Sequence, residues 1–547
     1  MPTVTINRKV LDRIIGKKLP DDKLKDRISM LGTDLERMDD SEIVVEIFPN
    51  RPDMLSEQGF GRAMCSFLGV QTGLRKYDVK KSGEKVIVTK EVKDVRPFTV
   101  CAIARNLKLD DEKIREIIQV QEKLHITFCR KRKKAAIGIY PLEKIKMPIT
   151  FTAKKPEDIK FRPLEANREM AANEILEQHP TGKEYAHLVK GLKKYAVFQD
   201  ANSEILSFTP IINSHKTGKV TDATKEVFIE VSGPSLHTNE YVLNILTCAL
   251  ADMGAQIYSM EVVYPDKTIT TPNLSPREVD YSLDFLNKTL GISLNHKEFK
   301  ENMEKMGFGV EKDKVLVPCY RPDIIHQVDL AEDLAIAYGY ETFIPELPKK
   351  ATPGEEDAIE KFRKKVSILL AGLNMLETSS YHISNKDLQL KKMLLKEKDY
   401  VELANSKSED YTLMRYSMLA SLMQILGENT HNEYPQDLYE MGYIFRQDDA
   451  EETGVREDLV LSIVKCGPDA EYTKIRQVLD YLFTSLDMKY EVKEASHPSY
   501  MEGRCAKIIV GGKDIGYLGE LNPQVLENFG VSMPAAGMEI KFWVIYK

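Results

Sequence analysis

The fold is decided by residues 317–345, VPCYRPDIIHQVDLAEDLAIAYGYETFIP. An extended apolar stretch leads to Arg321-Pro322-Asp323, where proline fixes its own φ and favours extended backbone at the arginine before it. Apolar residues then recur with the period of a helix, and Gly339 stands where that helix should stop. The segment therefore predicts a strand, a proline turn and a helix.

Four carboxylates accompany this helix. Asp329, Glu332 and Asp333 share one helical face, and Asp323 can fold back toward them. Oxygen ligands without Cys or His suit Mg²⁺ or Ca²⁺. In the alternative interpretation, Asp329 caps the helix while Glu332 and Asp333 complement its dipole, and the spacing alone favours this one.

Size and composition describe an ordinary soluble protein. A chain of 547 residues predicts three or four domains, and no apolar run reaches the ~18–20 residues that span a bilayer. The start MPTVTINRKV is not typical of a signal peptide, and the seven cysteines are scattered without a CxxC pair. We therefore expect a reducing cytoplasm and neither structural zinc nor disulfides. With a net charge of −7, any contact with RNA should depend on local basic patches.

Composition divides the chain into four expected domains: residues 1–85, 86–266, 267–346 and 347–547. The charged stretch 76–94 is expected to be a linker. Arg51-Pro52-Asp53 repeats the pattern of a strand, an Arg-Pro-Asp turn and a helix, which indicates a duplicated small α+β module. Strands that alternate with helices in the last domain predict an antiparallel sheet with packed helices.

Two features of the second domain could bind a ligand. Arg130, Lys131, Arg132, Lys133 and Lys134 are consecutive cations, which form either a solvated turn or a patch that contacts RNA phosphates. In the extended run 227–233 the alternation of side chains places Glu230 and Ser232 on one face. A lone glutamate in a strand is more often exposed to solvent than functional, so the sequence pattern alone assigns Glu230 no role.

Blocks along the whole chain resemble one family. The blocks are RPDI, VDLAEDLA and AYGY around the acidic helix, LHITFCRKR, LSFTPIIN and FIEVSG in the second domain, and LMRYSML, LYEMGYIFR, EGRCA and IGYLGELNP in the last. Together they are similar to the β subunits of phenylalanyl-tRNA synthetases of the archaeal and eukaryotic type. Asp333 stands where many relatives have Glu, which shortens the reach of that side chain by one methylene.

The resemblance implies an α+β multidomain fold: an N-terminal α+β module, an aminoacyl-tRNA editing domain, a winged-helix-like magnesium domain and a class II synthetase-like module without catalytic motifs. It implies that Asp323, Asp329, Glu332 and Asp333 bind Mg²⁺. So dense a cluster of cations in an acidic chain favours contact of residues 130–134 with tRNA. The implied editing pocket is formed by Leu206, Ser207, Pro210, Glu230 and Ser232.

An editing site would exploit the hydroxyl that distinguishes tyrosine from phenylalanine. An apolar pocket rejects an added hydroxyl only by ~10²-fold, whereas a site that hydrogen-bonds the hydroxyl can select for it. Glu230 is expected to accept that hydrogen bond. Neither Cys129 nor His125 has a convincing partner in the sequence, so we expect hydrolysis by a positioned water.

The last domain lacks the G-x-G-x-x-x-E-R type of element that an active class II site requires, so we expect Arg415 and Arg446 to form structural ion pairs. The resemblance implies that an α subunit activates phenylalanine with ATP and Mg²⁺, in an (αβ)₂ heterotetramer that charges tRNA(Phe) in the cytoplasm. Two alternatives remain: a nucleic-acid-binding scaffold without chemistry, and a self-sufficient class II ligase.

Overall fold

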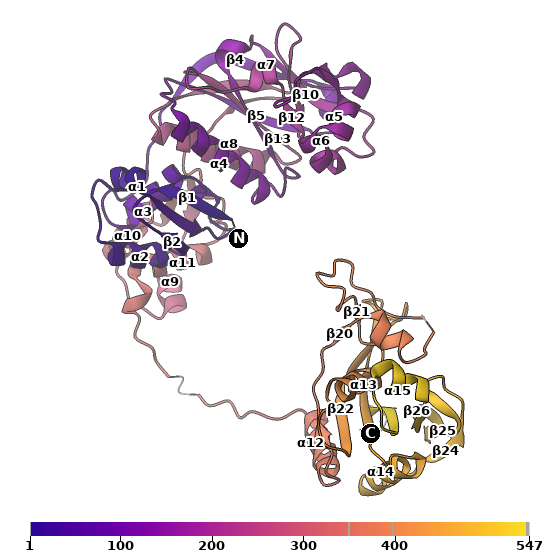
Figure 1. Ribbon diagram of the computed structural model, residues 1–547. Coiled ribbons are helices and arrows are strands. Elements are labelled where there is room, and N and C mark those ends of the chain that lie inside the picture. The colour runs from indigo at the N-terminus through magenta and orange to yellow at the C-terminus, as the bar shows by residue number, and fades with distance from the viewer. Residues whose placement is uncertain (1, 348–349, 397, 543–545, 547) are drawn as a thin grey trace. The chain divides into compact units, whose positions relative to one another are not determined.

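The computed structural model describes residues 2–347, 350–396, 398–542 and 546. The chain is a mixed α/β multidomain protein with two compact units, Met1–Glu346 and Leu347–Lys547 (Figure 1). None of the described helices has the length and apolar character needed to cross a membrane.

The first unit begins with a small α+β module. Its elements are β1 (Thr3–Asn7), α1 (Arg8–Ile15), α2 (Asp21–Met30), β2 (Asp34–Met38), β3 (Glu42–Glu46) and α3 (Glu57–Phe67). The strands form an antiparallel sheet in the order β1-β3-β2. Asn7 caps α1 by accepting hydrogen bonds from the backbone N–H groups of Lys9 and Val10, so the helix begins directly at the end of the first strand.

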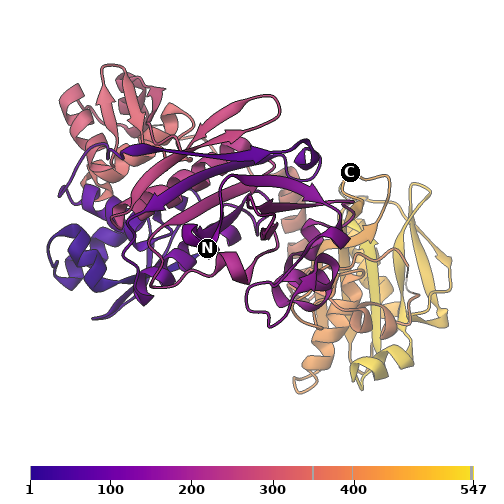
Figure 2. The ribbon, with the colours of Figure 1, turned by 90° about the horizontal axis from the view of Figure 1, so that it is seen from above.

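A second module repeats this topology. Its elements are β16 (Arg277–Asp280), α9 (Leu283–Leu290), α10 (His296–Lys305), β17 (Gly309–Glu311), β18 (Lys314–Val317) and α11 (Gln327–Tyr338), with strands in the order β16-β18-β17. The two modules lie at the same end of the first unit (Figure 2). The predicted duplication is confirmed, and so is the end of α11 at Gly339, which has a φ of 96°.

The two Arg-Pro-Asp turns share one geometry. Arg51 donates from Nε and Nη2 to the carboxylate oxygens of Asp53 at 2.9 and 2.8 Å. Arg321 donates in the same way to Asp323, at 2.9 and 2.7 Å. Both arginines are buried, at 6% and 2% exposure, so each fork-shaped pair provides the countercharge that a buried guanidinium requires.

The centre of the first unit is a ten-stranded sheet. Along the main path its order is β12-β11-β10-β7-β4-β14-β5-β13-β6, with β15 paired to β14. The strands are β4 (Val79–Val88), β5 (Phe98–Arg105), β6 (Ala136–Pro141), β7 (Ile149–Lys154), β10 (Tyr195–Gln199), β11 (Ile205–Thr209), β12 (Ile212–Asn213), β13 (Val227–Gly233), β14 (Gln256–Val263) and β15 (Thr268–Thr271). The helices of this region are α4 (Asp111–Ile126), α5 (Ala172–Gln178), α6 (Pro180–Tyr185), α7 (His215–Gly218) and α8 (Leu236–Asp252), and a two-stranded sheet pairs β8 (Lys160–Phe161) with β9 (Met170–Ala171).

The linker predicted for residues 76–94 is wrong. Much of it is β4, which runs parallel to both β14 and β7 inside the large sheet. Only Val86 and Val88 of this strand are buried, and most of the other positions from Lys80 to Lys85 carry polar or charged side chains. The strand therefore lacks the continuous apolar pattern by which interior parallel strands are recognised in a sequence.

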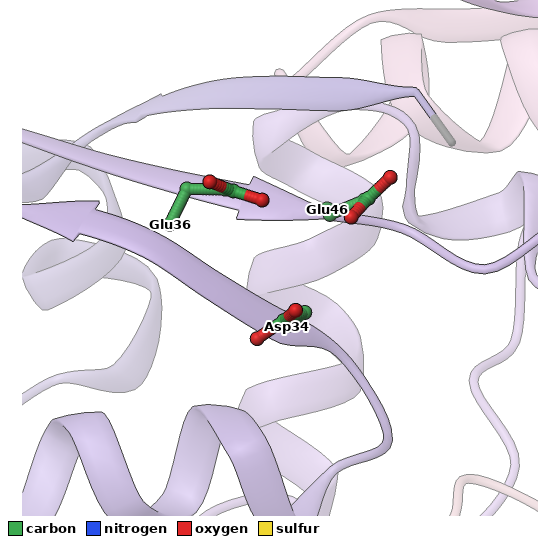
Figure 3. Close-up of side chains that lie close together, drawn as sticks. All are labelled: Asp34, Glu36 and Glu46. Atoms are coloured by element: carbon green, nitrogen blue, oxygen red, sulfur yellow. The ribbon is translucent and has the colours of Figure 1, made fainter. Parts of the chain in front are cut away.

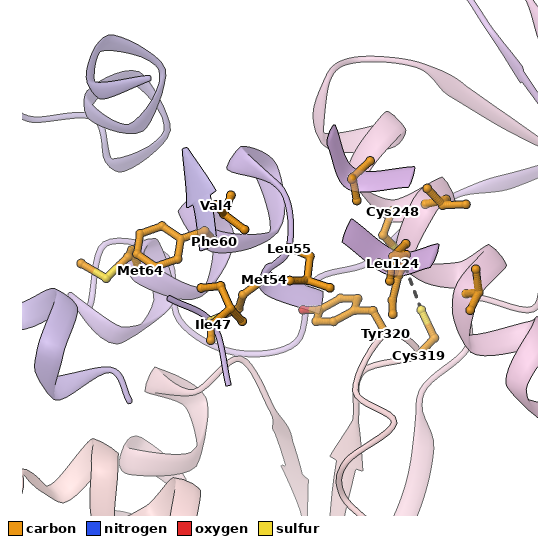
Figure 4. Packing of buried hydrophobic residues seen from close by; sticks show 14 of the residues in the cluster. Val4, Ile47, Met54, Leu55, Phe60, Met64, Leu124, Cys248, Cys319 and Tyr320 are labelled. Atoms are coloured by element: carbon orange, nitrogen blue, oxygen red, sulfur yellow. Dashed lines mark hydrogen bonds between the residues drawn. The ribbon is translucent and has the colours of Figure 1, made fainter. Parts of the chain in front are cut away.

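One face of the large sheet packs on α4 and α8, and this core continues into both small modules. Leu124 and Cys248 come from these two helices, and Figure 4 shows them near Tyr320 and the apolar residues of the N-terminal module. The sulfur atoms of Cys248 and Cys319 lie 3.7 Å apart as free thiols. The first unit is thus held together by shared hydrophobic packing, which is the main favourable term in folding.

The second unit is a seven-stranded sheet in the order β19-β22-β23-β27-β26-β25-β24. Its strands are β19 (Leu376–Glu377), β22 (Gln436–Gln447), β23 (Val455–Cys466), β24 (Glu491–Glu494), β25 (Tyr500–Val510), β26 (Lys513–Leu521) and β27 (Ala535–Lys541). The helices are α12 (Ala358–Ala371), α13 (Met418–Glu428), α14 (Tyr472–Ser485) and α15 (Pro523–Phe529), and β20 (Ile383–Ser384) pairs with β21 (Leu413–Met414). All neighbours in the large sheet are antiparallel except β19 and β22, which confirms the predicted sheet.

Candidate functional site

A cavity of about 460 Å³ opens beside β6 at the edge of the large sheet. Residues from α4, from β6 and from the loop after β11 form its walls, and Glu230 on β13 contributes to its lining. The lining residues used below are Glu122, His125, Arg132, Pro210, Asn213 and Glu230. The volume is within the range of small-molecule pockets, about 300–1,000 Å³.

Glu230 is a buried acid at this cavity. It is 2% exposed, and its Oε1 accepts a hydrogen bond from the Tyr140 hydroxyl at 3.2 Å. No described residue hydrogen-bonds the other oxygen, Oε2. Burial raises the pKa of Glu230 to about 8, although the positive charge of Arg96 opposes the shift. At neutral pH the side chain is therefore mainly a carboxylic acid, which can both donate and accept a hydrogen bond.

Tyr140 positions that acid. Its ring is fully buried and lies 5.9 Å from the ring of Phe228, centroid to centroid. Its hydroxyl lies 3.2 Å from Glu230 Oε1 and also 3.2 Å from Asn213 Oδ1. Because a hydroxyl carries a single proton, Glu230 and Asn213 compete for one donor.

Gly138 provides the space for this arrangement. It faces Glu230 across the β6–β13 pair, and a Cβ atom there would lie 2.5 Å from Glu230 Oε1 and 2.3 Å from the Tyr140 hydroxyl. Any other residue would displace both polar groups. Gly138 and Tyr140 were not predicted as site residues, and Asn213 lies in the block LSFTPIIN but was given no role, because cross-strand pairing brings these residues together.

The structure brings only part of the predicted pocket to the cavity. Pro210 and Glu230 line it, whereas Leu206 is buried in the apolar core on one face of the sheet. The Ser207 hydroxyl lies 3.0 Å from the hydroxyl of Thr209, and Ser232 accepts a hydrogen bond from Arg96 Nε at 3.1 Å. Leu206, Ser207 and Ser232 do not line the cavity themselves, but the Ser232 side chain interacts with Glu230 and the Ser207 side chain with Tyr140, and each lowers the pKa of its partner against the effect of burial.

His125 does have partners, contrary to the expectation from the sequence. Its Nε2 accepts a hydrogen bond from the backbone N–H of Ile137 at 2.9 Å, and its Nδ1 lies 3.2 Å from Glu122 Oε1. Burial lowers the pKa of His125, so the ring is neutral and its Nδ1–H donates to Glu122. With both nitrogens engaged, His125 has no lone pair to act as a general base. Cys129 is equally unsuited to catalysis, since burial raises the pKa of its thiol to about 12.

The basic turn 130–134 divides into two kinds of residue. Arg130, Lys131, Lys133 and Lys134 are exposed. Arg132 instead donates from Nη1 to the carbonyl oxygen of Ile211 at 2.7 Å, and its guanidinium lies over the Tyr185 ring. Arg132 thus ties the turn to the loop that carries Pro210, while the other cations remain available to a polyanion.

The carboxylates of the acidic helix surround a second cavity, of about 440 Å³, between the two small modules. Arg321 pairs with Asp323 and also with Asp333, whose Oδ2 lies 2.6 Å from Nη2. The carboxylate of Asp329 accepts hydrogen bonds from the backbone N–H groups of Ile325 and His326, 2.7 Å each. His326, not Asp329, is the N-cap of α11. Burial raises the pKa of Glu332, and the neighbouring charges of Asp333 and Asp323 raise it further.

This donor set fits a hard cation in chemistry, since four carboxylates line one cavity and Arg321 neutralises only part of their charge. Their oxygens have not converged. Among the described residues, only Asp34, Glu36 and Glu46 place three ligand atoms within 4.8 Å of one another, on the exposed sheet of the N-terminal module (Figure 3). A cation at Glu332 would therefore require the side chains around it to move.

The two arginines of the second unit differ. Arg415 is 1% exposed and pairs with Glu440 at 2.7 Å, which confirms the predicted structural role. Arg446 donates to the Tyr416 hydroxyl at 3.0 Å and lies over that ring, and no described residue forms an ion pair with it. The predicted ion pair of Arg446 is not formed among the described residues, because β22 directs this side chain into a cavity where the Tyr416 hydroxyl is its hydrogen-bond partner.

Similar proteins identify the family. A family profile described as the phenylalanyl-tRNA synthetase β-chain CLM domain matches residues 344–542, and one described as the tRNA synthetase B5 domain matches residues 279–340. A phenylalanine–tRNA ligase β subunit from Pyrococcus horikoshii is 39% identical over 556 residues, covering 100% of both chains. The chain belongs to the phenylalanine–tRNA ligase β-subunit family.

Two further comparisons agree with this family. The β subunit from Archaeoglobus fulgidus is 38% identical over 547 residues, covering 99% of this chain and 98% of that protein. A crystal structure of an N-terminal fragment of the P. horikoshii β subunit matches with a TM-score of 0.60 at 40% identity, and it covers 62% of this chain and 99% of the fragment. Membership of this ligase family places the chain in phenylalanyl-tRNA synthesis.

Proposed function

We propose that the first unit hydrolyses tRNA(Phe) mischarged with tyrosine, in the cavity that Glu230 lines. The observation that carries this proposal is the buried Oε2 of Glu230, which has no hydrogen-bond partner among the described residues. The hydroxyl of a tyrosyl group would satisfy this oxygen. A phenylalanyl group would leave it unpaired, at a desolvation cost of about 1–3 kcal/mol.

The reaction needs a water rather than a protein nucleophile. Cys129 is buried as a thiol, and both nitrogens of His125 are engaged. Water would attack the ester carbonyl, the bond from the carbonyl carbon to the ribose oxygen would break, and that oxygen would take the proton. The role of Glu230 and Tyr140 is then to hold the tyrosyl ring so that its ester meets the water.

The experiment is release of tyrosine from preformed Tyr-tRNA(Phe) by the complex, compared with release of phenylalanine from Phe-tRNA(Phe). We expect Glu230→Ala to slow tyrosine release at least ten-fold, which corresponds to about 1.4 kcal/mol. Glu226→Ala is the matched control, because Glu226 lies directly before the same strand and outside the cavity. Full tyrosine release by Glu230→Ala would remove Glu230 from the mechanism.

In this proposal the exposed cations of the turn 130–134 bind the tRNA and so position its mischarged end. Arg130, Lys131, Lys133 and Lys134 would contact tRNA phosphates, while Arg132 would keep the turn attached to the Pro210 loop. Each phosphate contact should contribute about 0.9 to the slope of log affinity against log salt. An unchanged slope in Lys133→Gln would exclude that residue from the contact.

The remaining functions belong to the assembled enzyme. We propose that an α subunit activates phenylalanine with ATP and Mg²⁺, that the assembly is an (αβ)₂ heterotetramer in the cytoplasm, and that the chain supports charging of tRNA(Phe). Asp323, Asp329, Glu332 and Asp333 would hold a further Mg²⁺, whose charge would offset that of the carboxylates. A calorimetric titration with Mg²⁺ that gave the same result for Glu332→Gln and wild type would argue against this site.

A further inference from the structure

The second unit contains a cavity of about 450 Å³ that the proposed editing function does not use. It lies over the antiparallel sheet, and we call it the sheet pocket. Its lining includes Tyr416, Arg446, His497, Tyr517, Glu539 and Lys541. These residues come from β22, β26, β27 and two connecting segments, so widely separated parts of the sequence converge on it.

Three cations and three carboxylates line the sheet pocket, but two of the cations are left without an ion pair among the described residues. Arg456 is paired with Asp458 at 3.1 Å and with Asp448 at 2.9 Å, and Asp514 is paired with Lys507 at 2.9 Å. Arg446 and Lys541 have no ion-pair partner in the described part of the chain. An unpaired guanidinium at a cavity is suited to carboxylate or phosphate, which it binds with two parallel hydrogen bonds.

Glu539 does not neutralise these two cations fully. Its Oε2 accepts hydrogen bonds from the Ser417 hydroxyl at 3.1 Å and from the backbone N–H of Leu419 at 2.8 Å, at the start of α13. Burial raises its pKa, although the charge of Arg446 opposes this shift. A carboxyl group that already caps a helix is a poor partner for the ammonium group of an amino acid. The two cations without a described ion pair, Arg446 and Lys541, therefore favour a phosphate over the ammonium group of a zwitterion.

Aromatic rings complete the lining. The His497 ring lies 4.8 Å from the Tyr517 ring and 5.3 Å from the Tyr500 ring, centroid to centroid. Burial lowers the pKa of His497 to about 4, so the ring is neutral and adds no further positive charge. Flat, neutral rings at the wall of a cavity favour a flat ring in the ligand.

We propose that the sheet pocket binds a small phosphate monoester that carries a flat ring, of the size of a nucleoside monophosphate, with Arg446 and Lys541 on the phosphate and the His497–Tyr517 pair beside the ring. This site is separate from the editing cavity and does not depend on the proposed editing activity.

The test is calorimetric titration of the full chain with AMP, adenosine, inorganic phosphate and phenylalanine. AMP should bind at least ten-fold more tightly than each of the other three. Arg446→Gln should weaken AMP binding at least ten-fold, while Arg504→Gln, an arginine on the neighbouring β25 outside the cavity, should leave it unchanged. Tyr517→Leu should weaken AMP more than phosphate.

Three results would overturn the proposal: no binding of AMP, equal binding by wild type and Arg446→Gln, or tighter binding of phenylalanine than of AMP. If Arg446→Gln unfolds, Lys541→Gln takes its place, because this lysine lies at the end of β27 and makes no described ion pair that its loss would break. Equal binding of AMP by Lys541→Gln and wild type would then count against the site.

Discussion

Burial raises the pKa of Glu230, and the charge of Arg96 and the side chains of Tyr140 and Ser232 offset this shift only in part, so the group is mainly a neutral acid at neutral pH. This changes the interpretation made from sequence, in which the side chain only accepted a hydrogen bond as a carboxylate. A neutral acid can donate to the tyrosine hydroxyl or accept from it. Selectivity for a tyrosyl over a phenylalanyl group then depends on whether Oε2 of Glu230 gains a hydrogen-bond partner, and less on whether Glu230 is charged.

The first prediction concerns the space that Gly138 leaves beside Glu230 and Tyr140. In Gly138→Ala the new methyl group would displace Glu230 and Tyr140, so release of tyrosine from Tyr-tRNA(Phe) should fall at least ten-fold. Overpacking of this kind costs about 1–3 kcal/mol of stability. Gly354→Ala is the control, since a Cβ there meets nothing within 4 Å. Tyrosine release at the wild-type rate by Gly138→Ala would mean that the tyrosyl group binds elsewhere.

The pKa of Glu230 makes a second prediction. Its folded value, about 8, is above the ordinary value of 4.5, so the folded state holds the proton more tightly. The stability that this group contributes is therefore complete below about pH 4.5 and is lost as pH rises through 8. Glu116 is also shifted to about 8, so the wild type must be compared with Glu230→Gln. The difference in unfolding free energy between the two proteins should change between pH 5 and 9, and a constant difference would contradict the assigned pKa.

Among the helices and strands, those whose positions depend on local sequence patterns were predicted correctly. The strands and helices around both Arg-Pro-Asp turns are where periodicity placed them, because proline geometry, capping and apolar spacing all agree there. The strand β4 was missed because its partners β7 and β14 lie far away in the sequence and its own pattern is polar. The candidate cavity was predicted only in part for the same reason. Glu230 and Pro210 lie in recognisable blocks, whereas Gly138 comes to Glu230 only through the pairing of β6 with β13.

Arg321 makes a prediction about how elements are joined. Its guanidinium links the turn at Asp323 to Asp333 in α11, and all three side chains are nearly buried. Arg321→Met would leave two buried carboxylates unpaired, so we expect a loss of about 3–5 kcal/mol. The exposed pair of Arg504 and Glu520 is the control, where Arg504→Gln should cost at most about 1 kcal/mol. Denaturant unfolding, fitted with a separate transition for each unit, measures both. Equal losses would show that the buried pair adds no more than a surface one.

At the scale of the whole molecule, the two units differ in what their cavities can do. The cavity beside β6 has a buried acid with one oxygen that no described residue hydrogen-bonds, whereas the sheet pocket has cations without an ion pair and aromatic rings. Arg415 cannot hold a nucleotide phosphate in the sheet pocket, because Glu440 and the carbonyl oxygen of Tyr443 already occupy its guanidinium. A site that binds a phosphate monoester without a second free arginine lacks the charge stabilisation that adenylate formation requires.

This division of chemistry leads to the last prediction, which concerns activation of phenylalanine. The chain alone should give no phenylalanine-dependent exchange of pyrophosphate into ATP, and addition of an α subunit should restore it. Arg446→Gln in the complex should leave the exchange rate within about two-fold of wild type, because activation is expected on the α subunit. A two-fold change corresponds to less than about 0.5 kcal/mol in the barrier. Exchange by the chain alone would instead support a self-sufficient ligase. A chain that bound tRNA but neither restored exchange with α nor released tyrosine would be a nucleic-acid-binding scaffold, and the family role would then have been lost.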